Sequence, residues 1–183
     1  MKTVTIMVAV LATALLVCGS SQAQVSVEIT AGYDMPTGDF ADNSDPGYGV
    51  GGNVFFGLPM IPIEIGGRAA YNYFGASDDF GDGQTTIIEI LPSVRYVLGF
   101  PMSPVKVFGQ LGAGMYMWKN EFEVKGFPIK TKDDGSDFGI SVGAGVRAKL
   151  GPLAGLTVLP LYHIIMTEEK NTTYLSLNVG IVF

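Results

Sequence analysis

The chain carries little charge and few of the residues that usually build metal sites or disulfides. Of its 183 residues 15% are charged, and it has one cysteine and one histidine. Acidic residues outnumber basic ones by 17 to 11, which gives a net charge of −6. Because binding to nucleic acid requires a basic surface, this composition excludes nucleic acid as a partner.

The chain also lacks an apolar run long enough for a membrane-spanning helix. Its one extended apolar run, residues 4–17, has about 14 residues, whereas a spanning helix needs about 20. Lys2 precedes this run and Ser21-Gln22-Ala23 follows it, which predicts a Sec signal peptide cleaved after Ala23. We therefore expect residues 1–23 to be removed and residues 24–183 to form one domain.

A lipidated Cys18 is the alternative interpretation of this segment. The residue before a lipidated cysteine is normally small, and Val17 is not, so we favour cleavage after Ala23. The mature chain then has no cysteine and can use neither disulfides nor thiolate metal ligands. The whole chain is 48% hydrophobic, so much apolar surface must face either a protein core or lipid.

After Gln24 the dominant pattern is an alternation of apolar and polar residues with a period of two, which is typical of β-strands. It recurs in eight segments: 25–33, 48–58, 63–73, 88–98, 105–118, 137–150, 156–166 and 172–183. The last segment is the clearest, because every second residue from Leu175 to Phe183 is apolar. Segment 156–166 is apolar on both faces, so we expect a weakly fixed register there and a bulge at Pro160.

The polar faces of these segments collect glycine, serine and charges of both signs. The charges are Glu28, Glu64, Arg68, Glu89, Arg95, Lys106, Arg147 and Lys149. Short turns rich in glycine and proline (57–62, 99–104 and 151–155) alternate along the chain with acidic and mostly longer connections (34–46, 75–84, 119–136 and 167–171). This alternation is expected of outer-membrane barrels, in which the short turns face the periplasm.

The final strand, LSLNVGIVF, ends on Phe183 with Leu177, Val179 and Ile181 at every second position before it. With the eight alternating segments and the leader, these residues resemble the small outer-membrane β-barrel proteins, the group of the OmpA transmembrane domain and the OmpX-type barrels. The resemblance implies an all-β, eight-stranded antiparallel up-and-down barrel in the outer membrane. It also implies lipid and lipopolysaccharide as surroundings, and recognition of the terminal residues by the barrel assembly machinery. We expect a monomer.

The eight polar-face charges have two possible roles. The interior of an eight-stranded barrel is just wide enough to be filled by side chains, so we expect them to form a buried network of ion pairs that plugs the lumen. The alternative is a gated pore or a small-ligand site. A lipocalin-like carrier, the main rival on fold, would turn its apolar face inward around a ligand.

Few residues suggest catalysis or metal binding. His163 is the only histidine, and no serine lies near it on its own strand, so the histidine–serine pattern of outer-membrane lipid A deacylases is missing. Asp78 to Gly83 lacks the acidic spacing and distal Glu of a calcium-binding EF-hand. We expect no catalytic residue, metal or cofactor.

Two further groups of residues are assigned to the ends of the barrel. The acidic residues of the connections are expected to be solvated and to contact lipopolysaccharide through divalent cations: Asp34, Asp39, Asp42, Asp45, Asp78, Asp79, Asp82, Asp133, Asp134, Glu168 and Glu169. The aromatics near strand ends are expected to form an interfacial girdle: Tyr33, Tyr48, Tyr71, Tyr73, Tyr96, Tyr116, Trp118 and Phe183. The preferred function is a non-enzymatic envelope protein with surface contacts. A narrow pore for small solutes is the alternative, and a lipid-modifying enzyme is disfavoured.

Overall fold

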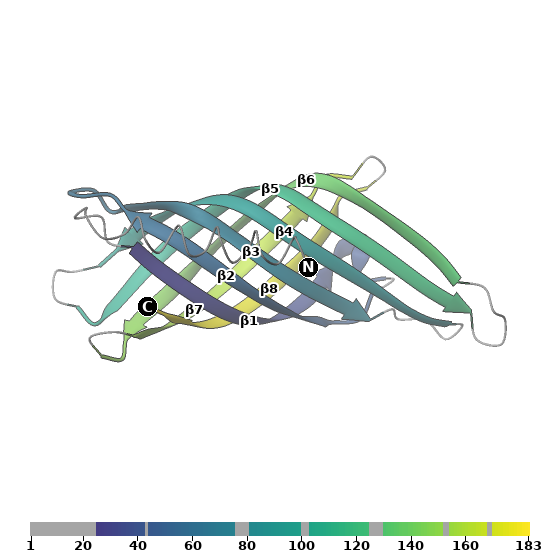
Figure 1. The fold of residues 1–183 in the computed structure, drawn as a ribbon, viewed down its shortest axis with the longest axis horizontal. Coiled ribbons are helices and arrows are strands. Elements are labelled where there is room, and N and C mark those ends of the chain that lie inside the picture. Colours follow the sequence, from purple (N-terminus) through teal and green to yellow (C-terminus); the bar gives the residue numbers. More distant parts are fainter. Residues whose placement is uncertain are drawn as a thin grey trace, which may run out of the picture.

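The computed structural model describes residues 25–42, 44–75, 81–99, 103–124, 130–151, 154–167 and 170–183. Eight antiparallel strands close into a barrel in chain order, with β8 paired to β1 (Figure 1). The elements are β1 (Val25–Thr37), the short 3-10 helix η1 (Gly38–Phe40), β2 (Gly47–Gly57), β3 (Ile63–Gly75), β4 (Gly81–Leu98), β5 (Val105–Val124), β6 (Lys130–Lys149), β7 (Gly155–Ile165) and β8 (Thr172–Val182). The predicted eight-stranded antiparallel barrel is confirmed. The predicted leader, residues 1–23, lies outside the described residues.

Burial alternates along the strands as the sequence pattern requires. In β8 the odd-numbered residues Leu177, Val179 and Ile181 face outward, whereas Ser176 and Asn178 are buried in the lumen. The apolar residues therefore cover the outer wall, the reverse of the lipocalin-like arrangement. Among the described residues, no helix has both the length and the apolar character needed to cross a membrane.

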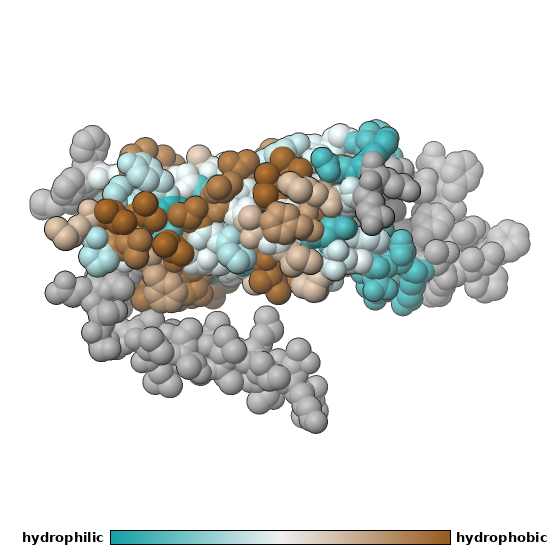
Figure 2. Space-filling view, turned by 90° about the horizontal axis from the view of Figure 1, so that it is seen from above, coloured by the Kyte–Doolittle hydropathy of each residue, from teal (hydrophilic) through white to brown (hydrophobic). Residues whose placement is uncertain are grey.

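Figure 2 shows the result on one face of the barrel: apolar residues extend over much of the wall, and hydrophilic residues gather toward one end. Successive strands of an up-and-down barrel reverse direction, so its connections fall into two sets at opposite ends. One end has the β2–β3, β4–β5 and β6–β7 connections, and the other has those of β1–β2, β3–β4, β5–β6 and β7–β8. We call the end with the predicted short turns, at residues 57–62, 99–104 and 151–155, the short-turn end. The opposite end is the long-loop end.

The prediction of a bulge at Pro160 is wrong. β6 and β7 keep one register on both sides of this residue, with Gly143 opposite Leu161 and Val146 opposite Val158. Proline lacks the backbone donor, so pairing is interrupted there, but no extra residue is inserted. The register of β7 is also well defined, although both of its faces are apolar. Leu159 and Leu161 pack in the lumen beside Phe108, whereas Pro160 faces outward.

The strands at the long-loop end are longer than predicted. β5 and β6 have 20 residues each, so residues 119–124 and 130–136, predicted as loop, continue the ladder as a protruding hairpin (Figure 1). Charges of opposite sign stand opposite one another there, Lys119 against Asp134 and Glu121 against Lys132. Such cross-strand pairs stabilise the extended ladder, in which β4 also pairs with β5 as far as Gly81 opposite Val124, and this explains why polar sequence continues as strand.

Two of the predicted girdle aromatics are misassigned. Tyr116 is completely buried, and Trp118 packs against a buried cluster formed by Phe74, Ile87, Leu91, Tyr116, Ile165 and Tyr174. Both residues share the face of Gln110, and the period of two therefore turns them into the lumen. The other six do lie on the outer surface: Tyr33, Tyr48, Tyr71, Tyr73, Tyr96 and Phe183.

Candidate functional site

The lumen of the barrel contains two groups of ion pairs. The group nearer the short-turn end joins Glu28, Glu64, Arg95 and Arg147, and the central group joins Arg68 and Glu89. These are six of the eight charges that the sequence places on the polar face. The other two, Lys106 and Lys149, form no ion pair among the described residues.

Arg95 and Glu28 form the most buried pair. Nη1 and Nη2 of Arg95 donate to Oε1 and Oε2 of Glu28, both at 2.7 Å, while Nε donates to Oε1 of Gln110 at 2.7 Å. Neither charged side chain has any exposed surface. The parallel, two-point geometry offsets much of the cost of removing both charges from water.

Aromatic rings enclose the Arg95 guanidinium. Its Cζ lies 3.8 Å from the centroid of the Phe55 ring and 4.6 Å from that of Phe108. Each ring attracts the cation through its electron-rich face and also excludes water from it. The cross-section of the lumen at this level is therefore filled by side chains from β1, β2, β4 and β5.

Arg147 connects this pair to Glu64. Its Nη2 donates to Glu28 Oε1 at 2.8 Å, and its Nη1 donates to Glu64 Oε1 at 3.1 Å. Asn53 Nδ2 donates to the other oxygen of Glu28 at 3.0 Å. Two arginines and two glutamates thus form a neutral group.

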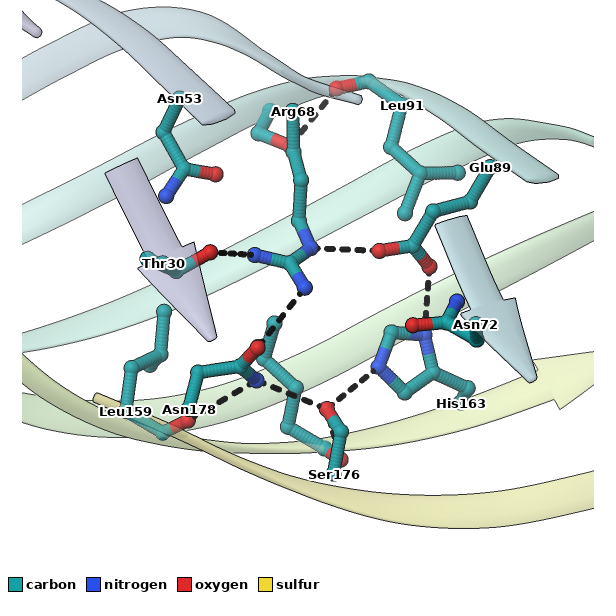
Figure 3. Close-up of polar contacts among 12 residues, drawn as sticks. Thr30, Asn53, Arg68, Asn72, Glu89, Leu91, Leu159, His163, Ser176 and Asn178 are labelled. Atoms are coloured by element: carbon teal, nitrogen blue, oxygen red, sulfur yellow. Dashed lines mark hydrogen bonds and ion pairs between the residues drawn. The ribbon is translucent and has the colours of Figure 1, made fainter. Parts of the chain in front are cut away.

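The central group is built around Arg68 (Figure 3). Its Nε donates to Glu89 Oε1 at 2.5 Å, Nη2 donates to Asn178 Oδ1 at 2.9 Å, and Nη1 lies 3.4 Å from Thr30 Oγ1. Four strands, β1, β3, β4 and β8, supply these groups. The contacts hold the arginine across the lumen rather than along the wall.

His163 continues this network from Glu89 toward β8 (Figure 3). Its Nδ1 lies 3.1 Å from Glu89 Oε2 and 3.0 Å from the Tyr116 hydroxyl, and its Nε2 lies 2.9 Å from Ser176 Oγ. The ring stacks on Tyr174 with a centroid distance of 4.3 Å. The search of the sequence for a serine on the same strand as His163 misses this network, because Ser176 comes from the adjacent strand.

Asp34 is a second site residue whose predicted environment is wrong. The sequence assigns it to a solvated acidic loop, but β1 continues to Thr37 and places Asp34 in the lumen with 1% of its surface exposed. Both carboxylate oxygens are without a hydrogen-bond partner among the described residues. Asp133 and Asp134 lie exposed on β6, whereas Asp78, Asp79, Glu168 and Glu169 lie outside the described residues.

The order carboxylate, histidine, serine in Glu89, His163 and Ser176 is that of a hydrolytic triad. None of the three has the exposure needed to meet a substrate, since their exposed fractions are 0%, 0% and 1%. Among the described residues no group of three or more potential metal ligands occurs. The network can hold and share protons, but the filled lumen keeps a substrate from the serine.

Comparison with known proteins identifies the same architecture. The model of the outer membrane protein beta-barrel domain family matches residues 5–183. Among solved structures, Neisserial surface protein A (NspA) aligns with a TM-score of 0.61 and 17% identity over 88% of this chain and 98% of that one. Ail, the attachment invasion locus protein of Yersinia pestis, solved in complex with the heparin analogue sucrose octasulfate, aligns with a TM-score of 0.54 and 17% identity over 89% and 100%. A major outer membrane protein of Thermus thermophilus aligns with a TM-score of 0.54 and 11% identity over 87% and 99%. No curated protein sequence matches the chain.

Proposed function

This chain belongs to the outer membrane protein beta-barrel domain family, and on that premise we propose that it is a non-enzymatic envelope protein with a plugged lumen. It is a small outer-membrane β-barrel whose fold resembles those of NspA and Ail. Its proposed role is to stabilise the outer membrane and to present its long-loop end for contact with lipopolysaccharide and with other surfaces.

The observation that carries the plugged lumen is the layer around Arg95. Glu28 binds this arginine at two points, and Phe55 and Phe108 cover its faces. An ion crossing this layer would have to separate a buried ion pair, which costs several kcal/mol for each unpaired charge. The layer therefore supports a structural role for the lumen charges over a conducting one.

The hairpin of β5 and β6 supports the surface-contact role. It is the longest strand pair and extends the long-loop end with exposed charges of both signs, among them Lys119, Lys132, Asp133 and Asp134. Ail has been solved with a sulfated ligand, sucrose octasulfate. For this chain, the exposed carboxylates favour contact with anionic lipopolysaccharide through divalent cations, which both partners can coordinate.

Single-channel recording tests the plug. The mature chain would be refolded in detergent, checked for the shift in electrophoretic migration on heating, and inserted into a planar bilayer. We expect no discrete conductance steps at moderate voltage from the wild-type barrel. Reproducible steps from the folded wild type would overturn the plug and make transport the function, whereas steps that appear only in a double variant Arg68→Met/Arg95→Met that folds unchanged would support it.

Binding of lipopolysaccharide tests the surface role. The double variant Asp133→Asn/Asp134→Asn removes two exposed carboxylates, and Ser136→Ala serves as the control because it changes an exposed residue of the same strand without removing a charge. We expect magnesium-dependent binding of purified lipopolysaccharide to fall in the double variant only. Equal binding by all three proteins, with or without magnesium, would contradict this assignment.

A fluorophosphonate probe tests the non-enzymatic assignment. Because Ser176 is enclosed, we expect this probe to leave the folded barrel unlabelled. Labelling that disappears in Ser176→Ala would show that substrates reach the Glu89–His163–Ser176 group, and the assignment would then be wrong.

A further inference from the structure

The short-turn end of the lumen opens into a cavity of about 140 Å³ with a mixed polar and apolar wall. Ser26, Lys106, Arg147 and Lys149 lie in its wall. A bound water needs about 10–15 Å³ by the same measure, so the space exceeds that of a single water molecule. Lys106 also lines a neighbouring hollow beside Glu64 and Val97.

Positive charge at this mouth exceeds negative charge. The carboxylates of Glu28 and Glu64 are already balanced by the guanidinium groups of Arg95 and Arg147. Lys106 and Lys149 add two further positive charges and take part in none of the ion pairs between described residues. Two cations thus share one cavity without a carboxylate partner in the described part of the chain.

Several hydrogen-bond donors at the same level have no acceptor in the described part of the chain. Arg147 Nε is buried and finds no partner there, although both terminal nitrogens of the same guanidinium are bound. The hydroxyl of Ser26, a residue only 7% exposed, and that of the buried Thr157 also find no partner in the described residues. Lys106 stands directly opposite Arg147 on the β5–β6 ladder, and Arg147 stands opposite Thr157 on β7.

Unpartnered buried donors cost free energy unless an acceptor reaches them, and here the donors that lack a partner include a guanidinium nitrogen. A tetrahedral oxyanion supplies several acceptor oxygens at once and neutralises ammonium groups. We propose that the cavity at the short-turn end binds a phosphate group, held by the ammonium groups of Lys106 and Lys149 and by the Nε of Arg147. The same chemistry fits inorganic phosphate and the phosphate of a phospholipid headgroup.

The positions of Lys106 and Arg147 argue against an ordinary contact with surrounding lipid. Lys106 alternates in step with the lumen-facing residue Phe108 and is half-buried, whereas its neighbour Val107 on the lipid side is exposed. Lys149 shares the face of Arg147 and lies exposed in the wall of the mouth. A phosphate must therefore enter the mouth of the barrel to reach Lys106 and Arg147 together with Lys149.

Nuclear magnetic resonance of the refolded barrel in dodecyl maltoside tests the proposal, with the Arg147 Nε–H resonance as reporter. The probes are inorganic phosphate and dihexanoylphosphatidylglycerol. We expect a saturable shift, with the affinity weakened about tenfold in Lys106→Gln and in Lys149→Gln, as for loss of one charge-assisted hydrogen bond. Lys132→Gln, on the distant hairpin, is the matched control and should bind as the wild type does.

The two probes distinguish the source of the phosphate. Saturation by inorganic phosphate identifies a free-anion site, whereas saturation by the lipid analogue alone identifies a headgroup site. The proposal is overturned if neither probe gives a saturable shift in the folded barrel, or if both lysine variants bind as tightly as Lys132→Gln. Two separate lysine variants keep the test decisive if one of them fails to refold.

Discussion

The Nε2 atom of His163 on β7 lies 2.9 Å from the Oγ atom of Ser176 on β8, and both residues are buried. Ser176 also accepts a hydrogen bond from Asn178 Nδ2 at 2.9 Å. Ser176→Ala leaves His163 Nε2 without this partner and Asn178 Nδ2 with the Leu159 carbonyl oxygen alone, so we expect the free energy of unfolding to fall by about 1–3 kcal/mol. Urea unfolding in lipid vesicles measures it, with the exposed Ser136→Ala as control.

Arg95 and Glu28 should behave as an energetically coupled pair. Removing one partner leaves a buried charge without its two-point contact, so we expect Arg95→Met and Glu28→Met each to lower the free energy of unfolding by about 3–5 kcal/mol. In the double variant neither charge remains, and the loss should be smaller than the sum of the two single losses. A double-mutant cycle by urea unfolding measures the coupling, and strictly additive losses would contradict it.

Much of the barrel can be predicted from the period-two pattern. Alternation from Leu177 to Phe183 indicates which side chains face outward, and the same rule places Arg68, Glu89 and Arg95 together on the lumen side. Because pairing in an up-and-down barrel follows chain order, the alternation of short turns and longer connections is enough to predict the topology. The period-two alternation, together with the order of the connections, is therefore enough to predict most of the fold.

Contacts across strands cannot be predicted in the same way. The meeting of His163 with Ser176 depends on the register between β7 and β8, which sequence alternation does not fix to one residue. Asp34 is assigned to a loop from sequence because acidic residues favour turns, whereas the strand continues past it. For Tyr116 and Trp118 two sequence signals disagree. Aromatic side chains near strand ends favour an interfacial girdle, whereas the period-two alternation turns both side chains into the lumen, and the structure follows the alternation.

Gly143 should not tolerate a side chain. A Cβ atom at this position would lie 2.0 Å from the carbonyl oxygen of Pro160, a distance that requires the backbone to move. We expect Gly143→Ala to lower the free energy of unfolding by about 1–3 kcal/mol, as for other overpacked interiors. Gly109→Ala is the matched control, because the nearest heavy atom there is 4.0 Å away. Equal stability of the two variants would show that β7 can shift freely.

Glu121, on the protruding hairpin, should become protonated only at low pH. Hydrogen bonds from the ammonium groups of Lys119 and then Lys132 lower the pKa of Glu121 to about 2. A lowered pKa in the folded state means that the interaction stabilises the hairpin above the ordinary glutamate pKa and is lost as the pH falls toward 2. Carboxyl chemical shifts followed against pH should show this, and Lys119→Gln/Lys132→Gln should return the Glu121 pKa toward its ordinary value.

Trp118 is the only tryptophan in the chain, so its fluorescence reports directly on whether it faces lipid or lumen. Its Nε1 donates to Asp137 Oδ2 at 2.6 Å, and its ring packs against the buried cluster in the lumen. Brominated acyl chains quench only fluorophores that they can approach, so we expect them to quench Trp118 weakly. The variant Trp118→Phe/Tyr73→Trp moves the single indole to an outward position and should be quenched strongly. Equal quenching of the two proteins would show that Trp118 faces lipid, as the girdle prediction has it. The side chains of β5 would then alternate in the opposite sense at this level.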